Sequence, residues 1–158
     1  MITPDFTGYG ARLHVNGNAP IEGSELEEMV KTFMSKVSLA CVDAGVKLIG
    51  HIKCIVEVPG DGYLSCSVTN HEGRPRCQGS LSDSSRFDMV LNIMIYGLEM
   101  EKVERIVSDQ VTSQFAGVGL SPRLEVVERE GGEAHEHHAH EGHAHEHHAH
   151  EEHPGHHH

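Results

Sequence analysis

Residues 47–69 read KLIGHIKCIVEVPGDGYLSCSVT and predict an antiparallel β-hairpin. Apolar side chains alternate with polar ones in both halves, which is the period of a strand with one buried face. The alternating residues are Ile52, Cys54, Val56, Val58, Leu64, Cys66 and Val68. The segment 59–61, Pro-Gly-Asp, supplies the turn between the halves. Because a shift of one residue would reverse the faces, this short turn places Cys54 opposite Cys66.

Two segments outside the hairpin have the three- and four-residue apolar spacing of amphipathic helices. The first begins in Ser24-Glu25-Leu26-Glu27, which reads as a capping box with Ser24 as the N-cap and Glu27 at N3. Gly45 is the expected end of this helix. The second helix is predicted over 99–115, and a glycine-rich segment at 117–119 closes it.

Four further segments have the character of strands. Residues 11–15 predict a short strand, residues 76–81 a short edge strand, and residues 123–128 the last strand. Residues 87–95 are apolar on one face and half apolar on the other, which predicts a central strand. This second face and an exposed Ile55 indicate that a partner covers the sheet, and a second copy of the chain is the suggested partner.

The predicted order is β-α-β-β-(β)-β-α-β, in which the strand at 76–81 is the optional one. This order predicts an α+β fold, a two-layer sandwich of a mainly antiparallel sheet with two helices on one face. Without the optional strand it comes close to the ferredoxin-like order. Because that fold hosts many activities, the order by itself does not define a function. The fold is expected over 1–130, and a separate segment follows at 131–158.

The composition excludes several classes of partner. The chain has 158 residues, with 12 Lys and Arg against 24 Asp and Glu, and its formal net charge is −12. An acidic chain without a basic cluster is a poor partner for nucleic acid or for an anionic membrane surface. No apolar run is long enough to span a bilayer, and residues 1–6 do not resemble a secretion signal. We therefore expect a cytoplasmic protein whose four Cys residues are reduced.

The composition changes abruptly at Gly131-Gly132. Residues 131–158 hold thirteen of the sixteen His residues and six Glu, with no Lys or Arg and no large apolar side chain. The octet AHEHHAHE occurs at 134–141 and returns ten residues later at 144–151. Because such a segment has no large apolar side chains from which to build a hydrophobic core, we predict that it is a disordered His/Glu-rich tail.

The tail is also the strongest chemical signal in the chain. Neutral imidazole binds Ni²⁺, Zn²⁺, Co²⁺ and Cu²⁺, and an unperturbed His pKa of about 6.5 leaves most rings neutral near physiological pH. We expect several weak, exchanging sites, since each ion must order part of a mobile chain. Ni²⁺ is the favoured ion, with Zn²⁺ or Co²⁺ as alternatives. The predicted metal ligands are His135, His137, His138, His140, His143, His145, His147, His148, His150, His153, His156, His157 and His158.

Residues 134–158, with the repeated His-Glu-His-His-Ala-His-Glu, resemble the His-rich tails of nickel, cobalt and zinc accessory proteins. Among these are urease nickel metallochaperones and the nickel-insertion proteins of hydrogenase and carbon monoxide dehydrogenase. The resemblance implies metal storage or delivery to a maturing metalloenzyme. It also implies an accessory GTPase as a possible partner, because residues 1–130 contain no nucleotide-binding loop.

Two other interpretations stay open at this point. In the first, the body is a small-molecule-sensing or protein-interaction module and its tail is incidental. In the second, the tail is a pH-responsive solubility segment, because protonation of thirteen His would change its charge from −6 to +7 (13 − 6).

The Cys residues give a weaker signal, and their spacing contains no Cys-x-x-Cys. Cys41 lies on the apolar face of the first helix and is interpreted as a core residue. Cys54 and Cys66 face each other across the hairpin, and core packing is favoured there over a soft-metal thiolate pair or a redox-dependent disulfide. A less favoured alternative makes Cys77 a metal ligand near the loop that contains His71.

His51, Lys53 and Glu57 share one face of a strand and form a candidate polar site, although a solvated sheet face is the favoured explanation. His14 and His71 have no partner that the sequence reveals. No Ser/His/Asp, Cys/His or phosphate-loop pattern occurs in the chain, so catalysis is not predicted and enzyme activity is left open.

Overall fold

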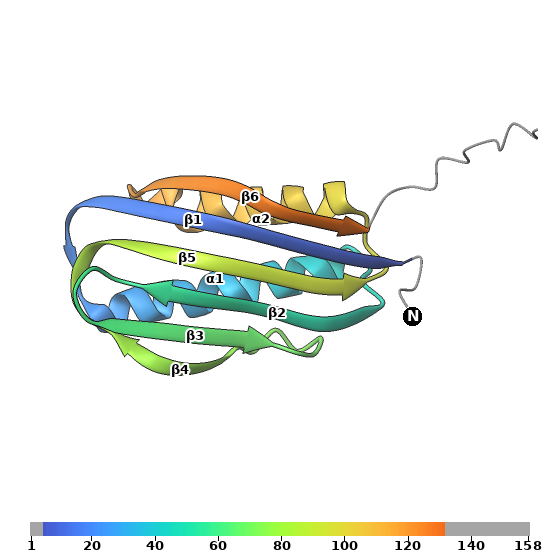
Figure 1. The fold of residues 1–158 in the computed structure, drawn as a ribbon, viewed down its shortest axis with the longest axis horizontal. Coiled ribbons are helices and arrows are strands. Elements are labelled where there is room, and N and C mark those ends of the chain that lie inside the picture. Colours follow the sequence, from blue (N-terminus) through green and yellow to red (C-terminus); the bar gives the residue numbers. More distant parts are fainter. Residues whose placement is uncertain (1–4, 132–158) are drawn as a thin grey trace, which may run out of the picture.

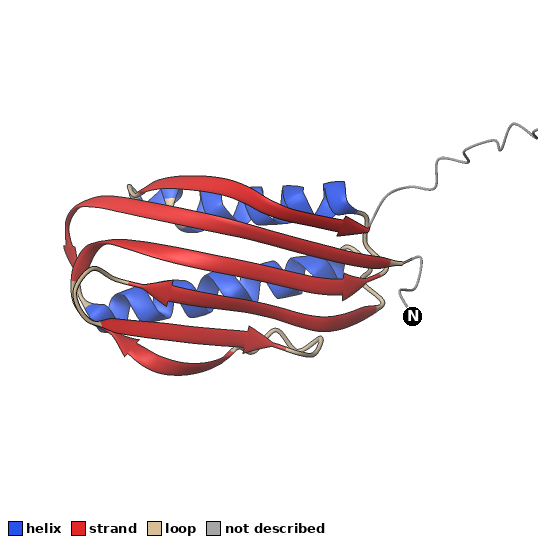
Figure 2. Cartoon of the chain, viewed as in Figure 1, coloured by secondary structure: helices blue, strands red, loops and turns tan. Residues whose placement is uncertain are grey.

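The computed structural model describes residues 5–131, and it has the predicted α+β architecture. One antiparallel sheet of six strands forms the first layer, and two helices lie side by side along one of its faces (Figures 1 and 2). No helix in this part of the chain combines the length and the apolarity needed to cross a membrane.

The elements follow one another in the predicted order, with the optional strand present. Their bounds are β1 (Phe6–Ile21), α1 (Gly23–Asp43), β2 (Leu48–Glu57), β3 (Gly62–Val68), β4 (Arg76–Leu81), β5 (Ser84–Tyr96), α2 (Met100–Gln114), a 3₁₀ turn (Ala116–Val118) and β6 (Ser121–Gly131). The strands are arranged as β4-β3-β2-β5-β1-β6 (Figure 1). The prediction that β5 is central is confirmed, and β4 is an edge strand as expected. The β3–β4 pair extends the sheet beyond β2.

The register predicted for the hairpin is confirmed. Cys54 of β2 lies opposite Cys66 of β3, and Val56 lies opposite Leu64. Because side chains alternate with a period of two, this register places all four residues on the buried side of the sheet.

Strand β1 is much longer than the predicted strand at 11–15, since it covers sixteen residues. Gly8 and Gly10 interrupt its apolar alternation, and glycine is unfavourable in a strand on propensity alone. The strand nevertheless continues through them, because β1 pairs along its length with both β5 and β6.

The predicted capping box at the start of the first helix is wrong. Helix α1 begins at Gly23, and Ser24 makes no capping hydrogen bond. The turn between β4 and β5 occupies this place instead. The Gly23 N–H donates to Asp83 Oδ1 at 2.9 Å, and the Leu81 N–H donates to Glu27 Oε1 at 3.0 Å. A Cβ atom on Gly23 would lie 1.9 Å from the Leu81 carbonyl oxygen, so only glycine fits here.

The predicted helix ends are confirmed. At the end of α1, Gly45 has φ +94°, its N–H donates to the Val42 carbonyl, and the Val46 N–H donates to the Cys41 carbonyl. This pair of hydrogen bonds is a Schellman motif, which satisfies the last free carbonyls of a helix. Helix α2 fills the predicted range 99–115 to within a residue at each end.

The hydrophobic core lies between the helices and the sheet. Its centre is a cluster of three rings, in which Phe115 packs at 5.3 Å from Phe33 of α1 and at 5.5 Å from Phe87 of β5. All three side chains are buried. No helix of residues 5–131 lies over the opposite face of the sheet (Figure 2). We call it the open face.

Candidate functional site

The predicted metal ligands of the tail all lie outside the described residues. The predicted disorder of the tail concerns the same residues and therefore stays a prediction. Within residues 5–131, no three His, Cys, Asp or Glu side chains gather closely enough to hold a metal ion. The metal-binding prediction therefore rests on residues 131–158 alone.

The cysteines depart from two expectations. Cys66 and Cys77 form a disulfide bond between β3 and β4, with their Cα atoms 4.1 Å apart. The prediction that all four cysteines are reduced is therefore wrong. So are the alternatives of a Cys54–Cys66 pair and of Cys77 as a metal ligand beside His71. The cause is the β3–β4 register, which places Cys77 directly opposite Cys66 on the side away from Cys54.

The two free thiols, Cys41 and Cys54, are buried in the core. Burial raises the pKa of Cys41 to about 11 and that of Cys54 to about 12. For Cys54, a hydrogen bond from the Cys66 backbone opposes this shift in part. Both groups are thus protonated at neutral pH, and metal ions bind the thiolate. Their position and protonation agree with the interpretation of Cys41 and Cys54 as core residues.

The predicted polar group of His51, Lys53 and Glu57 lies on the open face of β2. The residues opposite them on β5 are Met94, Asn92 and Asp88, in that order. Lys53 and Glu57 are exposed and His51 is partly exposed. The hollows described below are lined by other residues, so this group is part of a solvated surface.

A hollow of about 300 Å³ lies at one end of the open face, beside the turn between β2 and β3. Its lining consists of His14, Val15, Asn16, Pro59, Arg86, Phe87, Asp88 and Arg123. We call it the His14 hollow. His14 Nδ1 pairs there with Asp88 Oδ1, a partner that the sequence did not reveal. The β1–β5 and β1–β6 registers bring the groups together, because His14 lies between Asp88 and Arg123 on its two neighbouring strands.

The His14 hollow is rich in hydrogen-bond donors. The guanidinium groups of Arg86 and Arg123 form no ion pair with any described residue. Because Nδ1–H of His14 donates to the Asp88 carboxylate, Nε2 of the neutral ring is an acceptor, and the side-chain donors left for an anion are those of the two arginines. The hollow is therefore lined by two guanidinium groups without an ion-pair partner among residues 5–131 and by one carboxylate, Asp88, in a body whose formal charge over residues 1–130 is −6 (12 − 18). Such a group of donors suits a small anion.

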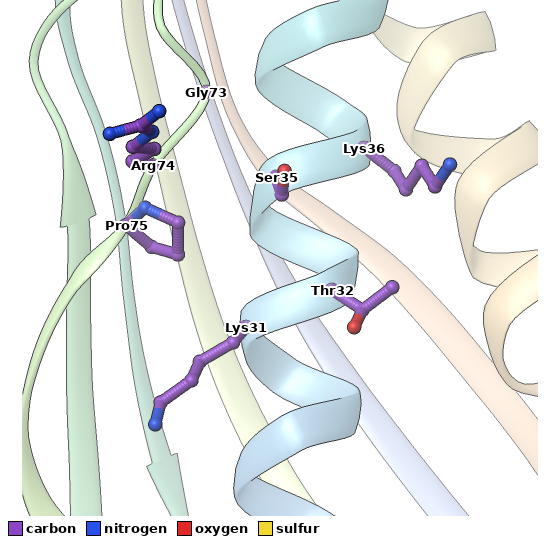
Figure 3. Close-up of a pocket in the computed structure, with 7 residues that line it drawn as sticks. All are labelled: Lys31, Thr32, Ser35, Lys36, Gly73, Arg74 and Pro75. Atoms are coloured by element: carbon purple, nitrogen blue, oxygen red, sulfur yellow. The ribbon is translucent and has the colours of Figure 1, made fainter.

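A second hollow, of about 340 Å³, lies between α1 and the loop before β4 (Figure 3). Three cationic residues line it, Lys31, Lys36 and Arg74. Figure 3 shows their charged ends pointing in different directions, and the Lys31 ammonium lies 3.5 Å from Glu28. The three charges therefore do not converge on one point of this hollow.

One buried titratable group lies on the helix-facing side of β1. The Tyr9 hydroxyl is buried and has no hydrogen-bond partner among the described residues. Burial raises the pKa of Tyr9 to about 12, the Glu104 carboxylate adds to the rise, and Arg129 opposes it. The hydroxyl is thus protonated at neutral pH and brings no charge into the core.

Comparison with known proteins assigns no family to the chain. No protein-family model matches it, and no curated protein matches it significantly. Among solved structures, the chain is similar to a hydantoinase/carbamoylase family amidase from Burkholderia ambifaria, with 9% sequence identity and a TM-score of 0.42. This match covers 82% of the present chain but only 29% of the amidase chain.

Proposed function

We propose that this protein binds Ni²⁺, or alternatively Zn²⁺ or Co²⁺, through its His-rich segment, and that it stores the ion or delivers it to a maturing metalloenzyme. The observation that carries the proposal is the repeated octet at 134–141 and 144–151, within a segment of thirteen His residues. Imidazoles at this density bind divalent transition ions, and the interleaved carboxylates offset the charge of the ion.

The proposal divides the chain into two working parts. Strand β6, at the edge of the sheet, ends at Gly131, and the His-rich segment follows directly. The body would then recognise a client metalloenzyme or an accessory GTPase, while the segment holds exchangeable ions. Such a role belongs in the cytoplasm, where the Cys66–Cys77 bond would be exposed to cellular reductants.

Calorimetric titration with Ni²⁺ tests this function. The full chain should bind several ions at pH 7.5 and lose them near pH 5, where imidazoles of ordinary pKa of about 6.5 are protonated. A full-length variant with Asn in place of the thirteen His of 131–158 should bind none of these ions.

The matched control replaces the three body histidines, His14, His51 and His71, by Asn and should retain the full number of ions. The proposal is wrong if the tail variant binds as many Ni²⁺ ions as the unaltered chain.

We propose as a second function that the His14 hollow binds a small anion, a carboxylate or a phosphate. The observation that favours it is the pair of guanidinium groups, Arg86 and Arg123, that have no ion-pair partner among the described residues. Arginine binds both anion types through paired hydrogen bonds. A volume of about 300 Å³ is at the small end of the range for ligand sites.

Chemical-shift titration with inorganic phosphate and with acetate measures this binding. The double variant Arg86→Gln/Arg123→Gln should weaken the binding of the preferred anion at least about tenfold, since each charged hydrogen bond contributes about 1.5–3 kcal/mol. Arg105→Gln, on the exposed surface of α2, is the control and should leave binding unchanged. Equal binding by the double variant would exclude the hollow as the anion site.

A further inference from the structure

We infer that the open face of the sheet is an interface that binds a second copy of this chain. In the described part of the chain, eight large hydrophobic side chains are exposed, and six of them lie on this face. The six are Leu48, Ile55, Tyr63, Val90, Met94 and Val127. We call them the apolar patch. The inference is independent of the functions proposed above.

The strand register brings the centre of the patch together, with Asn92 between Val90 and Met94 along β5 and the exposed Arg12 opposite Val90 on β1. Ile55 lies opposite Val90, and both are nearly half exposed, at 45% and 48%. Met94 lies opposite Gly8, and the next open-face position of β1 is Gly10. The position of a Gly10 Cβ lies 3.0 Å from Glu128 Cβ and 3.7 Å from Val127 Cγ2, so side chains of β6 cover this part of β1. The exposed face of an antiparallel sheet is normally polar, so an apolar one indicates a surface that is covered in the working assembly.

At the level of Lys53 in the sheet, the charges beside the patch are separated by sign. On the β2–β4 side, Lys53 and Arg76 are exposed on the open face. On β6, at the opposite edge of the sheet, Glu125, Glu128 and Glu130 lie beside the open-face positions of β1. At this level the open face has one basic flank and one acidic flank, and at the level of Asp88 the signs are reversed, with Glu57 on the β2 side and Arg123 on β6.

This arrangement is complementary to itself. A twofold axis in the plane of the interface and parallel to β5 places the basic flank of one copy over the acidic flank of the other. The same rotation places the apolar patches in contact. A twofold contact of this kind uses one surface on both subunits and closes after two copies. Because the body has a net negative charge, a close contact between copies needs such a separation of charge, and the open face provides it.

The open face is large enough for a stable dimer. Six strands spaced by about 4.8 Å give a width of about 24 Å, and ten residues at about 3.3 Å each give a length of about 33 Å. The product, about 800 Å² per copy, equals the area that each partner buries in a standard protein interface. The His14 hollow lies at the end of the strands, beside the turn at 59–61, and is therefore at the rim of this interface.

Sedimentation equilibrium of the full chain tests the inference, with EDTA present so that metal ions do not link the tails. The unaltered chain should be a dimer at micromolar concentration. Val90→Lys places a charge at the centre of the patch and should weaken the dimer about 100-fold. The matched control is Val118→Lys, because Val118 is 64% exposed in the 3₁₀ turn, outside the open face. Circular dichroism should show that both variants are folded.

A pair of charge variants tests the twofold arrangement. The first reverses the basic flank with Lys53→Glu and Arg76→Glu, and the second reverses the acidic flank with Glu125→Lys and Glu128→Lys. Each variant alone should be monomeric because like flanks meet, whereas an equal mixture should form dimers because opposite flanks meet.

Three results would overturn the inference. If the unaltered chain is still monomeric at about 100 μM, 100-fold above the concentration of about 1 μM at which a dimer is expected, the face does not bind a second copy. A dimer that Val90→Lys leaves intact would show that the copies meet elsewhere. A mixture of the charge variants that stays monomeric would exclude the twofold arrangement.

Discussion

Replacing Phe115 by Ala is expected to lower the free energy of unfolding by about 3–5 kcal/mol, which is the range for a large aromatic side chain removed from a packed core. Phe115 is fully buried where α2 ends, and its ring contacts those of Phe33 and Phe87. It therefore joins both helices to the central strand. Its removal leaves a cavity that these elements, held by the sheet and by each other, fill only in part.

Urea unfolding followed by far-ultraviolet circular dichroism measures this loss. The control is Val118→Ala, three residues away on the exposed 3₁₀ turn, and it should change the free energy of unfolding by less than about 0.5 kcal/mol. A loss below about 1 kcal/mol for Phe115→Ala would show that the three-ring cluster does not hold the layers together.

The Cys66–Cys77 disulfide is expected to contribute about 3 kcal/mol to the stability of the oxidised chain. The two residues are separated by 11 positions, and closing a loop of this length in the unfolded chain removes entropy worth about that amount. Cys77→Ser should therefore lower the free energy of unfolding by about 3 kcal/mol. Adding a reductant to the unaltered protein should lower it to the same value and should leave the variant unchanged.

Thiol titration in denaturant provides an independent measurement. The oxidised chain should expose two thiols, Cys41 and Cys54, and the reduced chain four. Trapping thiols at the moment of cell lysis extends this test to the cellular compartment, because a disulfide persists mainly under oxidising conditions. Four free thiols in the trapped, unreduced protein would contradict the disulfide in the cell.

Much of the fold was predictable because it depends on short-range patterns. The alternation of apolar residues in 47–69 sets the faces of β2 and β3, and the short turn sets their register. The spacing of apolar residues sets both helices, and Gly45 ends the first because glycine readily adopts a positive φ. The half-apolar second face of 87–95 indicated that β5 is central, and the structure confirms it.

The errors share a different origin, since each involves a contact between two segments that the pattern of neither segment specifies. Ser24 was predicted to cap α1, but the turn that contains Asp83 binds the start of this helix. The sequence revealed no partner for His14, because Asp88 lies 74 positions away in sequence although it is beside His14 in the sheet. The Cys66–Cys77 bond likewise depends on β4 pairing with β3 in one particular register.

The sequence by itself determined the type of each helix and strand, the faces they bury and the concentration of imidazoles in 131–158, on which the metal-binding proposal rests. Only the tertiary structure decided which side chains meet: the His14 hollow, the disulfide, and the gathering of exposed apolar side chains on the open face. The physical reason is that periodicity is a property of neighbouring residues, whereas contact across a sheet depends on how distant strands pair. A strand pattern leaves that pairing undetermined until the whole core is packed.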